Sequence, residues 1–457
     1  MPFSHTIAAV STPPGLGGLG VIRLSGWSAT AIADRVFRGA TPGKTLSSLP
    51  GYTACYGHVY DGEGDLDECV ATVFRAPHSY TGEEVVELSC HGGAYLLQRV
   101  LRAVLEAGAS PAGPGEFTRR AFENGKLDLS AAESVMALIE AKGRLGVRTA
   151  LASREGAVFR RMQQVKESLT GALANLAAFV DYPDEDIPEL APAALSATLG
   201  EADRILTRLL NTFDAGRAVR EGIDTAIVGA PNVGKSTLMN ALTGEESSIV
   251  TDTAGTTRDV VEQTVRMGEV LLRLADTAGI RDTEDRVEAI GVSRARDRLR
   301  RAALVLAVFD GSRPLSDADR QVAEEIGDAP AVALINKADL PQVIDKQYIQ
   351  GKFQQVVEIS AATGQGLDRL LDTLRRVTGV CQLTGEEPVL ATERQRDCAR
   401  RALEAIREGN AALEAGVTLD AVTVSLEDGL AAILELTGER VTDSVVNEVF
   451  ARFCVGK

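Results

Sequence analysis

The clearest chemistry in this chain lies in residues 229–236, whose sequence GAPNVGKS consists of a glycine, four further residues and then Gly-Lys-Ser. This P-loop pattern follows the apolar run 226–228 and precedes a helical pattern at 238–242. In a strand–loop–helix setting, backbone N–H groups surround a β-phosphate and the helix N-terminus adds positive charge. Lys235 supplies a formal charge, and the Ser236 hydroxyl is a Mg²⁺ ligand. The predicted phosphate-side residues are Asn232, Val233, Gly234, Lys235, Ser236 and Thr237.

The base is specified about a hundred residues later. Asn336, Lys337 and Asp339 end the apolar run 332–335. An Asp at that strand end accepts hydrogen bonds from N1–H and the 2-amino group of guanine, which adenine cannot offer, and a buried acceptor left unpaired rejects the wrong base. A second guanine-contacting loop is predicted after another apolar run, at Ser360, Ala361 and Ala362. The nucleotide is therefore predicted to be GTP.

Two further segments lie between these motifs. The sequence DTAG, formed by Asp276, Thr277, Ala278 and Gly279, ends the run 271–275 (LLRLA). Its Asp would hold Mg²⁺ through water, and its Gly would sense the γ-phosphate. Residues 251–259 (TDTAGTTRD) stand where a switch loop belongs, and Thr257 would complete the Mg²⁺ shell. Each piece alone is an ordinary turn, but four in this order predict a Ras-like GTPase domain.

The hydrolytic step needs an unusual arrangement. Position 280 after DTAG is Ile, where Ras-like enzymes use Gln to orient water, and no arginine finger lies in the P-loop. The Asn232 amide oxygen and the carbonyl-rich loop 251–256 could hold a K⁺ ion that acts electrostatically as an arginine finger does. Glu288 is the candidate for positioning the water. Its alternative interpretation is a solvated charge in an acidic loop.

Length and composition limit the number of domains, the class of partner and the location that can be expected. At 457 residues, two to four domains are expected. A net charge of −16 argues against high-affinity binding of nucleic acid by this chain alone. It does not exclude binding through a local basic patch or through a basic partner protein. No apolar run reaches the ~18 residues of a membrane span, and no signal-peptide pattern opens the chain, so a cytoplasmic protein without membrane partners is expected. Six cysteines without a CxxC pair and four scattered histidines predict no zinc site.

The pattern along the chain predicts a multidomain α/β protein. Residues 1–118 are predicted as an α+β domain, and 119–219 and 380–457 as two parts of a helical domain. Residues 220–379 alternate strands and helices, as a doubly wound, Ras-like P-loop fold does, and are predicted to be inserted between the two helical parts. A long amphipathic helix is predicted over 158–180, where apolar residues recur at spacings of three and four.

The two ends of the chain carry unusual sequences. The chain closes on Cys454-Val455-Gly456-Lys457, which is either a reactive tail or, as chain ends and lone cysteines usually are, a disordered and inert one. Near the start, residues 13–20 (PPGLGGLG) are predicted to shape a tight loop before a strand at 21–24.

Over essentially its whole length, the chain closely resembles the MnmE (TrmE) family of bacterial tRNA modification GTPases. The resemblance rests on the central GAPNVGKST and TDTAGTTRD and on several more specific motifs. These are TIAA at 6–9, TPPGLGGLGVIRLSG at 12–26, SYTGE at 79–83, HGG at 91–93, PGEFTRRAFENGKLDL at 114–129 and FARFCVGK at 450–457. Many GTPases share the central motifs, whereas few share the ends.

The resemblance implies a homodimer of three-part chains. The N-terminal domain would dimerise and bind a tetrahydrofolate, and the G domains would meet face to face with K⁺ and GTP. It also implies the FAD- and NADH-using partner MnmG (GidA), with which the chain would form a heterotetramer. Together they would add an aminomethyl or carboxymethylaminomethyl group to C5 of the wobble uridine (U34) of certain tRNAs. The one-carbon unit would come from 5,10-methylenetetrahydrofolate, of which 5-formyltetrahydrofolate is an analogue.

The resemblance also assigns roles that spacing alone does not. It places folate contacts on residues that otherwise look like ordinary strand or surface charges: Arg23, Glu87, Lys126 and Lys457. It places K⁺ on Asn232, Thr251, Thr253 and Thr256, Mg²⁺ on Ser236 and Thr257, and catalysis on Lys235 and Glu288. Thr253 stands where the family suggests an apolar residue, which matters little if its backbone carbonyl makes the contact. Cys454 stays open between a chemical and a structural role.

A second function class competes with the modification enzyme. Regulatory and ribosome-assembly GTPases that act by binding also carry the P-loop Asn and lack the Gln. Such proteins tend to append basic RNA-binding modules. Here the flanks are acidic and the chain ends in CVGK, which favours the modification enzyme.

Overall fold

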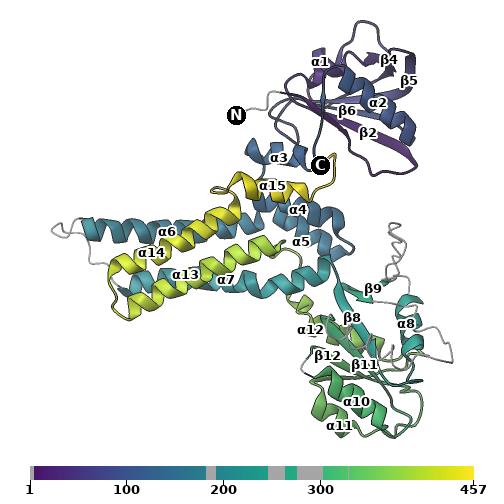
Figure 1. Cartoon of the computed structure of the whole chain (residues 1–457), viewed down its shortest axis with the longest axis vertical. Helices are drawn as coiled ribbons and strands as arrows, with labels where there is room; N and C mark the ends of the chain where they lie inside the picture. The colour runs from purple at the N-terminus through teal and green to yellow at the C-terminus, as the bar shows by residue number, and fades with distance from the viewer. Residues whose placement is uncertain (1–4, 182–191, 245–262, 275–301, 328) are drawn as a thin grey trace. The chain divides into compact units, whose positions relative to one another are not determined.

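A computed structural model describes residues 5–181, 192–244, 263–274, 302–327 and 329–457 (Figure 1). The chain forms two compact units, each discontinuous in sequence. The first unit comprises Met1–Met136, Phe159–Ala202 and Asp397–Lys457, and the second comprises Ala137–Val158 and Asp203–Arg396. No helix within the described ranges is both long enough and apolar enough to cross a lipid bilayer.

The first unit contains a seven-stranded sheet in the order β3-β4-β5-β6-β2-β1-β7. The strands are β1 (Ile7–Val10), β2 (Gly17–Ser25), β3 (Phe37–Gly39), β4 (Thr53–Asp61), β5 (Gly64–Phe74), β6 (Val85–Gly92) and β7 (Ser110–Pro111). All neighbours are antiparallel except β1 and β7. Helices α1 (Ala29–Ala33) and α2 (Ala94–Glu106) share a core with the sheet. This arrangement confirms the predicted α+β character of the N-terminal part.

Strand β2 begins earlier than the glycine-rich sequence suggests. The predicted tight loop is wrong for residues 17–20, which pair with β6 across a register shift between Gly17 and Leu19. Gly20 serves close packing instead, because a Cβ there would lie 2.4 Å from the Leu97 side chain of α2.

The rest of the first unit is helical. Its elements are α3 (Glu116–Glu123), α4 (Leu129–Glu140), α6 (Ala157–Asp181), the start of α7 (Pro192–Arg220), α13 (Glu393–Glu414), α14 (Leu419–Thr437) and α15 (Asp443–Ala451). Met162, Val165, Leu169 and Leu176 of α6 are buried, which confirms the predicted amphipathic helix. Glu439, just past α14, accepts a 2.8 Å hydrogen bond from Gln163 of α6.

The second unit is built on a six-stranded sheet in the order β13-β12-β11-β8-β10-β9. Its strands are β8 (Ile223–Val228), β9 (Gln263–Met267), β10 (Val270–Leu274), β11 (Leu304–Asp310), β12 (Ala331–Asn336) and β13 (Gln355–Glu358). Only β9 runs antiparallel to its neighbour. The helices are α8 (Lys235–Gly244), α10 (Asp317–Ile326), α11 (Lys346–Lys352) and α12 (Leu367–Val377). The β8–α8 and β12–β13 connections confirm the predicted doubly wound, P-loop architecture.

The core of the second unit extends beyond this α/β sandwich. Leu145 of α5 (Arg144–Arg154), Val219 of α7 and Val389 belong to the same buried cluster as Val270 and Leu272 of β10. The Ser153 hydroxyl donates to the Val389 carbonyl oxygen at 3.1 Å. Helices on both sides of the GTPase-like sequence therefore share its hydrophobic core.

Candidate functional site

The P-loop has the predicted setting between β8 and α8. Gly229 has φ +157°, and a Cβ there would lie 2.4 Å from the Val308 carbonyl oxygen. Gly234 has φ +98°, and a Cβ there would lie 2.2 Å from the Asn336 side-chain nitrogen. Asn232 is a non-glycine residue at φ +61° and is exposed. The loop therefore needs glycine at both motif positions, and leaves the Asn232 side chain accessible.

Lys235 and Ser236 stand at the start of α8, where phosphate chemistry requires them. The Lys235 Nζ donates to the carbonyl oxygens of Gly229 and Ala230, at 2.9 and 2.8 Å. Burial lowers the pKa of Lys235, because the charged form loses hydration. Ser236 offers a hydroxyl oxygen, the type of ligand that Mg²⁺ prefers. The loop thus combines a cation, an oxygen ligand and the positive end of a helix.

Asn336 connects the P-loop with both guanine-site segments. Its side-chain nitrogen donates to the Val233 carbonyl oxygen, and its side-chain oxygen accepts from the Ala361 N–H, both at 2.9 Å. Ser360 is fully buried beside Ala361, and Asp339 is exposed. The carboxyl ends of β8, β12 and β13 therefore bring three predicted nucleotide-binding segments together at one edge of the parallel sheet, the usual ligand edge of such folds.

Asp310 at the end of β11 belongs to this edge but escaped the sequence analysis. It accepts a 2.6 Å hydrogen bond from Lys337, whose φ is +63°. Burial opposes ionisation of Asp310, but hydrogen bonds from Lys337 and Ser312 outweigh it and lower the pKa of the carboxyl. The signal that the sequence offered was an Asp at the end of a fully apolar run, 304–309.

The remaining predicted catalytic and metal-binding positions lie outside the described residues. They are Thr251, Thr253, Thr256, Thr257, Asp276, Thr277, Ala278, Gly279 and Glu288. Strands β9 and β10 stand between the two groups in the sequence.

The first unit brings two of the four predicted folate residues into direct contact. Arg23 and Glu87 are register partners on β2 and β6. The Arg23 Nε and Nη2 atoms both lie 2.8 Å from the Glu87 Oε1 atom. The Arg23 guanidinium carbon also lies 5.6 Å from the ring centroids of Tyr80 and Phe117. The arrangement offers a planar cation, a carboxylate and aromatic surface at one place.

The C-terminal tail is ordered against this region, so the disordered alternative is wrong. Val455 forms a β-bridge with Pro114, and the Lys457 carbonyl oxygen accepts a 3.2 Å hydrogen bond from the Phe117 N–H. Gly456 has φ +96°, and a Cβ there would lie 2.4 Å from the Val10 carbonyl oxygen. Cys454 is exposed. Because Phe117 contacts both Arg23 and the Lys457 backbone, one residue links the end of the chain to the Arg23–Glu87 pair.

Lys126 is the outlying member of the predicted folate set. Its Nζ donates to the Pro77 carbonyl oxygen at 3.0 Å, and the described contacts include none between Lys126 and Arg23 or Glu87. Its stem lies beside Gly82, where a Cβ would be 3.4 Å from the Lys126 Cγ. The structure thus places the Lys126 side chain, from the segment after α3, against the loop that carries Tyr80.

A buried ion-pair network, which was not predicted from the sequence, supports that loop. Arg120 of α3 is fully buried and lies 3.1 Å from Glu83 and 2.8 Å from Glu116. The Ser25 hydroxyl donates to Glu83 at 2.7 Å. Arg120 follows the buried Phe117 by three residues, so it falls on the apolar face of α3. A charge on that face was the signal that could have found it.

Comparisons with known proteins agree with this geometry. The chain matches the family description "GTP-binding protein TrmE N-terminus" over residues 6–126 and "MnmE helical domain" over residues 129–454. It is 38% identical to the tRNA modification GTPase MnmE of Alkaliphilus oremlandii, with 100% of both chains covered. It is 41% identical to the protein of the same name from Geobacter metallireducens, again with 100% of both covered.

Among solved structures, the chain is similar to a variant of Aquifex aeolicus Era bound to GDP and AlF4⁻. That likeness has 28% identity and a TM-score of 0.27, and covers 40% of this chain and 66% of the other. The full-length similarity to curated relatives carries the family assignment. The chain belongs to the tRNA modification GTPase MnmE family.

Proposed function

We propose that this protein hydrolyses GTP as part of the modification of the wobble uridine of tRNA. The observation that carries the proposal is the Asn336 junction, which assembles the P-loop and both guanine-site segments at one edge of the sheet. Membership of the tRNA modification GTPase family supplies the substrate class. The reaction takes place in the cytoplasm, where tRNAs are found.

In this proposal, the nucleotide site works by charge placement. Lys235 holds the β- and γ-phosphates, Ser236 and Thr257 hold Mg²⁺, and Asp276 holds it through water. Mg²⁺, when bound, neutralises charge on the β- and γ-oxygens. Asp339 selects guanine. The segment from Thr277 to Gly279 senses the γ-phosphate. The accessible Asn232 amide supports K⁺ binding together with Thr251, Thr253 and Thr256, and Glu288 orients the attacking water.

The folate site belongs to the first unit. Glu87 accepts hydrogen bonds from pterin N–H groups, while Arg23 and Lys126 face the negative charges of the glutamate tail. Lys457 closes the site, since its backbone is fixed on Phe117. The bound group is 5,10-methylenetetrahydrofolate, which supplies the one-carbon unit. The exposed Cys454 stays a candidate for chemistry in the same region.

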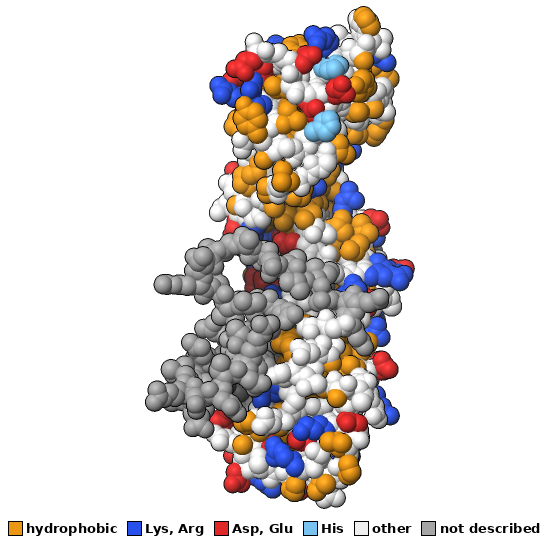
Figure 2. Space-filling view, turned by 90° about the vertical axis from the view of Figure 1, so that its right-hand side faces the viewer, with side chains coloured by type: hydrophobic (Ala, Val, Ile, Leu, Met, Phe, Trp, Pro, Cys, Tyr) orange, Lys and Arg blue, Asp and Glu red, His pale blue; other side chains and the backbone are white. Residues whose placement is uncertain are grey.

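Assembly with other chains completes the proposal. Several large hydrophobic side chains of the N-terminal part are exposed, among them Leu16 at 97%, Leu19 at 71% and Tyr95 at 73%. Figure 2 shows hydrophobic side chains over the surface of this part of the molecule. Such exposure supports a homodimer contact there. The dimer joins two chains of the FAD-dependent MnmG (GidA) protein in a heterotetramer.

In this proposal, the functional division of the chain is the one that the sequence predicts. Residues 1–118 bind folate and dimerise, 220–379 bind GTP, and 119–219 with 380–457 form the helical part that ends in CVGK. The two compact units cut the chain differently, because α5 and the end of α7 pack on the GTPase sheet.

Mass spectrometry of tRNA nucleosides tests the proposal. Cells lacking the gene should lose C5-modified wobble uridines, and the restored gene should return them. Genes carrying Asp339→Asn or Arg23→Ala separate the two sites, because the first impairs GTP use and the second impairs folate use. An unchanged nucleoside profile in the deletion strain would refute the modification function and favour a ribosome-assembly GTPase.

A further inference from the structure

The second unit contains a cavity of about 490 Å³ that none of the functions above uses. It lies between the start of α5, the end of α12, the turn between β9 and β10, and the segment after α12. Among the described residues, its charged lining consists of Arg144, Arg148 and Arg375 against one carboxylate, Glu269. Apolar lining residues, including Leu145 and Leu383, are buried beneath them. The cavity therefore has an apolar floor and an excess of positive charge.

The positive charge of the arginines that line this cavity is largely uncompensated by carboxylates. Within the described ranges, Arg144 and Arg375 form no ion pair. Arg148 lies 3.2 Å from Glu386, but the two side chains are 45% and 82% exposed, so this pair contributes little. Helix α5 carries three arginines and no acidic residue. Guanidinium groups with unused donors in a fork match the oxygens of a phosphate.

The Glu269 carboxylate, which is the one acidic group in the described part of the lining, is already engaged. A Glu269 side-chain oxygen accepts a 3.0 Å hydrogen bond from the Leu145 N–H at the start of α5. Glu269 occupies the turn between β9 and β10, and the neighbouring Gly268 packs against Leu371 of α12. Glu269 thus lowers the positive potential of the cavity without an ion pair to any of the three arginines among the described contacts.

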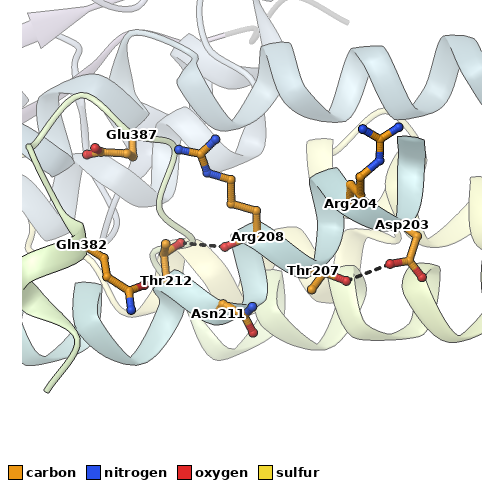
Figure 3. A pocket seen from close by; sticks show the side chains of 8 residues that line it. All are labelled: Asp203, Arg204, Thr207, Arg208, Asn211, Thr212, Gln382 and Glu387. Carbon is orange, nitrogen blue, oxygen red and sulfur yellow. Dashed lines mark hydrogen bonds between the residues drawn. The ribbon is translucent and has the colours of Figure 1, made fainter. Parts of the chain in front are cut away.

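Another cavity in the same unit lacks this charge imbalance. It measures about 350 Å³ and is shown in Figure 3. Arg204 and Arg208 point the same way from α7, but Asp203 and Glu387 line the same space. Two carboxylates balance two guanidinium groups there, so an anion has no net attraction to it.

We propose that the α5–α12 cavity binds a phosphate of the tRNA backbone. The inference rests on the proposed function, which supplies tRNA as the substrate. A chain with a net charge of −16 repels RNA at long range, so a local cluster of arginines is needed to hold it. Arg144 and Arg148 are accessible at the mouth, which suits a phosphate presented by a large ligand. Small-molecule pockets, by contrast, are mostly apolar and enclose their ligands.

Binding of fluorescein-labelled tRNA to the full-length chain, followed by fluorescence anisotropy, tests the site. Arg144→Gln and Arg375→Gln should each weaken binding roughly ten-fold, the size of a lost charge-assisted hydrogen bond. Each should also lower the slope of log affinity against log salt by about 1. Arg369→Gln is the matched control, because Arg369 lies on α12, is exposed and does not line the cavity. Thermal unfolding verifies that all variants fold.

Glu269→Gln gives the opposite expectation. Glutamine keeps an acceptor for the Leu145 N–H but removes the negative charge, so tRNA should bind roughly three-fold more tightly. A structural role alone predicts weaker or unchanged binding. A gain in this variant and losses in the two arginine variants would together support the proposal.

Two outcomes would overturn the assignment. If the double variant Arg144→Gln/Arg375→Gln binds tRNA as Arg369→Gln does, the cavity does not hold the backbone. If pyrophosphate binds in a manner that depends on both arginines while tRNA affinity does not, the phosphate source is a free anion. A failure of this assignment can be distinguished from a failure of the proposed function. The proposed function is tested by GTP hydrolysis and by the wobble-uridine profile of the wild-type protein, and neither measurement uses the cavity variants.

Discussion

Asn336 holds the P-loop through a 2.9 Å hydrogen bond from its side-chain nitrogen to the Val233 carbonyl oxygen. Asn336→Ala removes this bond and leaves the carbonyl oxygen and the Ala361 N–H without their partner. We expect a loss of about 1–3 kcal/mol in the free energy of unfolding and a comparable loss in GTP binding. Urea denaturation and fluorescent-GTP titration measure the two effects. Unaltered GTP affinity would contradict the role of this junction.

Asp339 is exposed at the edge where the guanine base is expected. Asp339→Asn exchanges one acceptor for a donor, so it should weaken GTP binding by about 10- to 100-fold and favour xanthosine triphosphate. Competition between the two nucleotides measures this change. The fold should be unaffected, since the side chain is exposed. Retained preference for GTP would remove Asp339 from the base-binding site.

Asp310 makes the stability of the second unit depend on pH. Its pKa is lowered in the folded protein, because hydrogen bonds from Lys337 and Ser312 outweigh its burial. A lowered carboxyl pKa adds stability that is present above about pH 4 and is lost as pH falls through the folded value. Asp310→Asn should therefore be less stable than wild type by about 1–2 kcal/mol at neutral pH. The difference should vanish in acid. Denaturant unfolding across the pH range gives the measurement, and a constant difference at every pH would be inconsistent with this account.

In the first unit, substitution of Arg120 should lower stability, whereas substitution of Arg23 should impair folate binding. Arg120 is fully buried, and its removal leaves the nearly buried Glu83 charge uncompensated. We expect Arg120→Ala to cost about 3–5 kcal/mol of stability. Arg23→Ala should instead abolish binding of 5-formyltetrahydrofolate while the unfolding midpoint moves little. Calorimetric titration and thermal unfolding of both variants decide this, and full folate affinity in Arg23→Ala would rule out the assignment.

Potassium should accelerate GTP hydrolysis if Asn232 helps to hold the ion. We expect the rate to fall by about 10-fold or more when Na⁺ replaces K⁺, the size of effect that a lost charge contact to the transition state has. Asn232→Ala should lose the difference between the two ions. Glu288→Ala should bind GTP normally but fail to hydrolyse it. Equal rates in both salts for the wild-type protein would dismiss the cation mechanism.

The sequence predicted the parts of this protein that local patterns encode. Strand–loop–helix context located Lys235 and Ser236, and apolar runs located Asn336 and Ser360. Apolar spacing placed α6 close to its observed bounds. The partners that arise only on folding were not visible, because nothing in the local sequence of Asp310, Arg120 or Glu269 names a residue 27, 37 or 124 positions away. The tail was misjudged for the same reason, since its support comes from Pro114 and Phe117.

The shared core of the second unit limits how this protein can be divided. A fragment cut at residues 220 and 379 would lose Leu145, Val219 and Val389, which cover Val270 and Leu272 within one buried cluster. That fragment would expose apolar surface and be prone to aggregate. A piece that keeps residues 137–158 together with 203–396 retains every member of this cluster. A catalytic domain inserted in this way cannot be exchanged between proteins unless parts of its host travel with it.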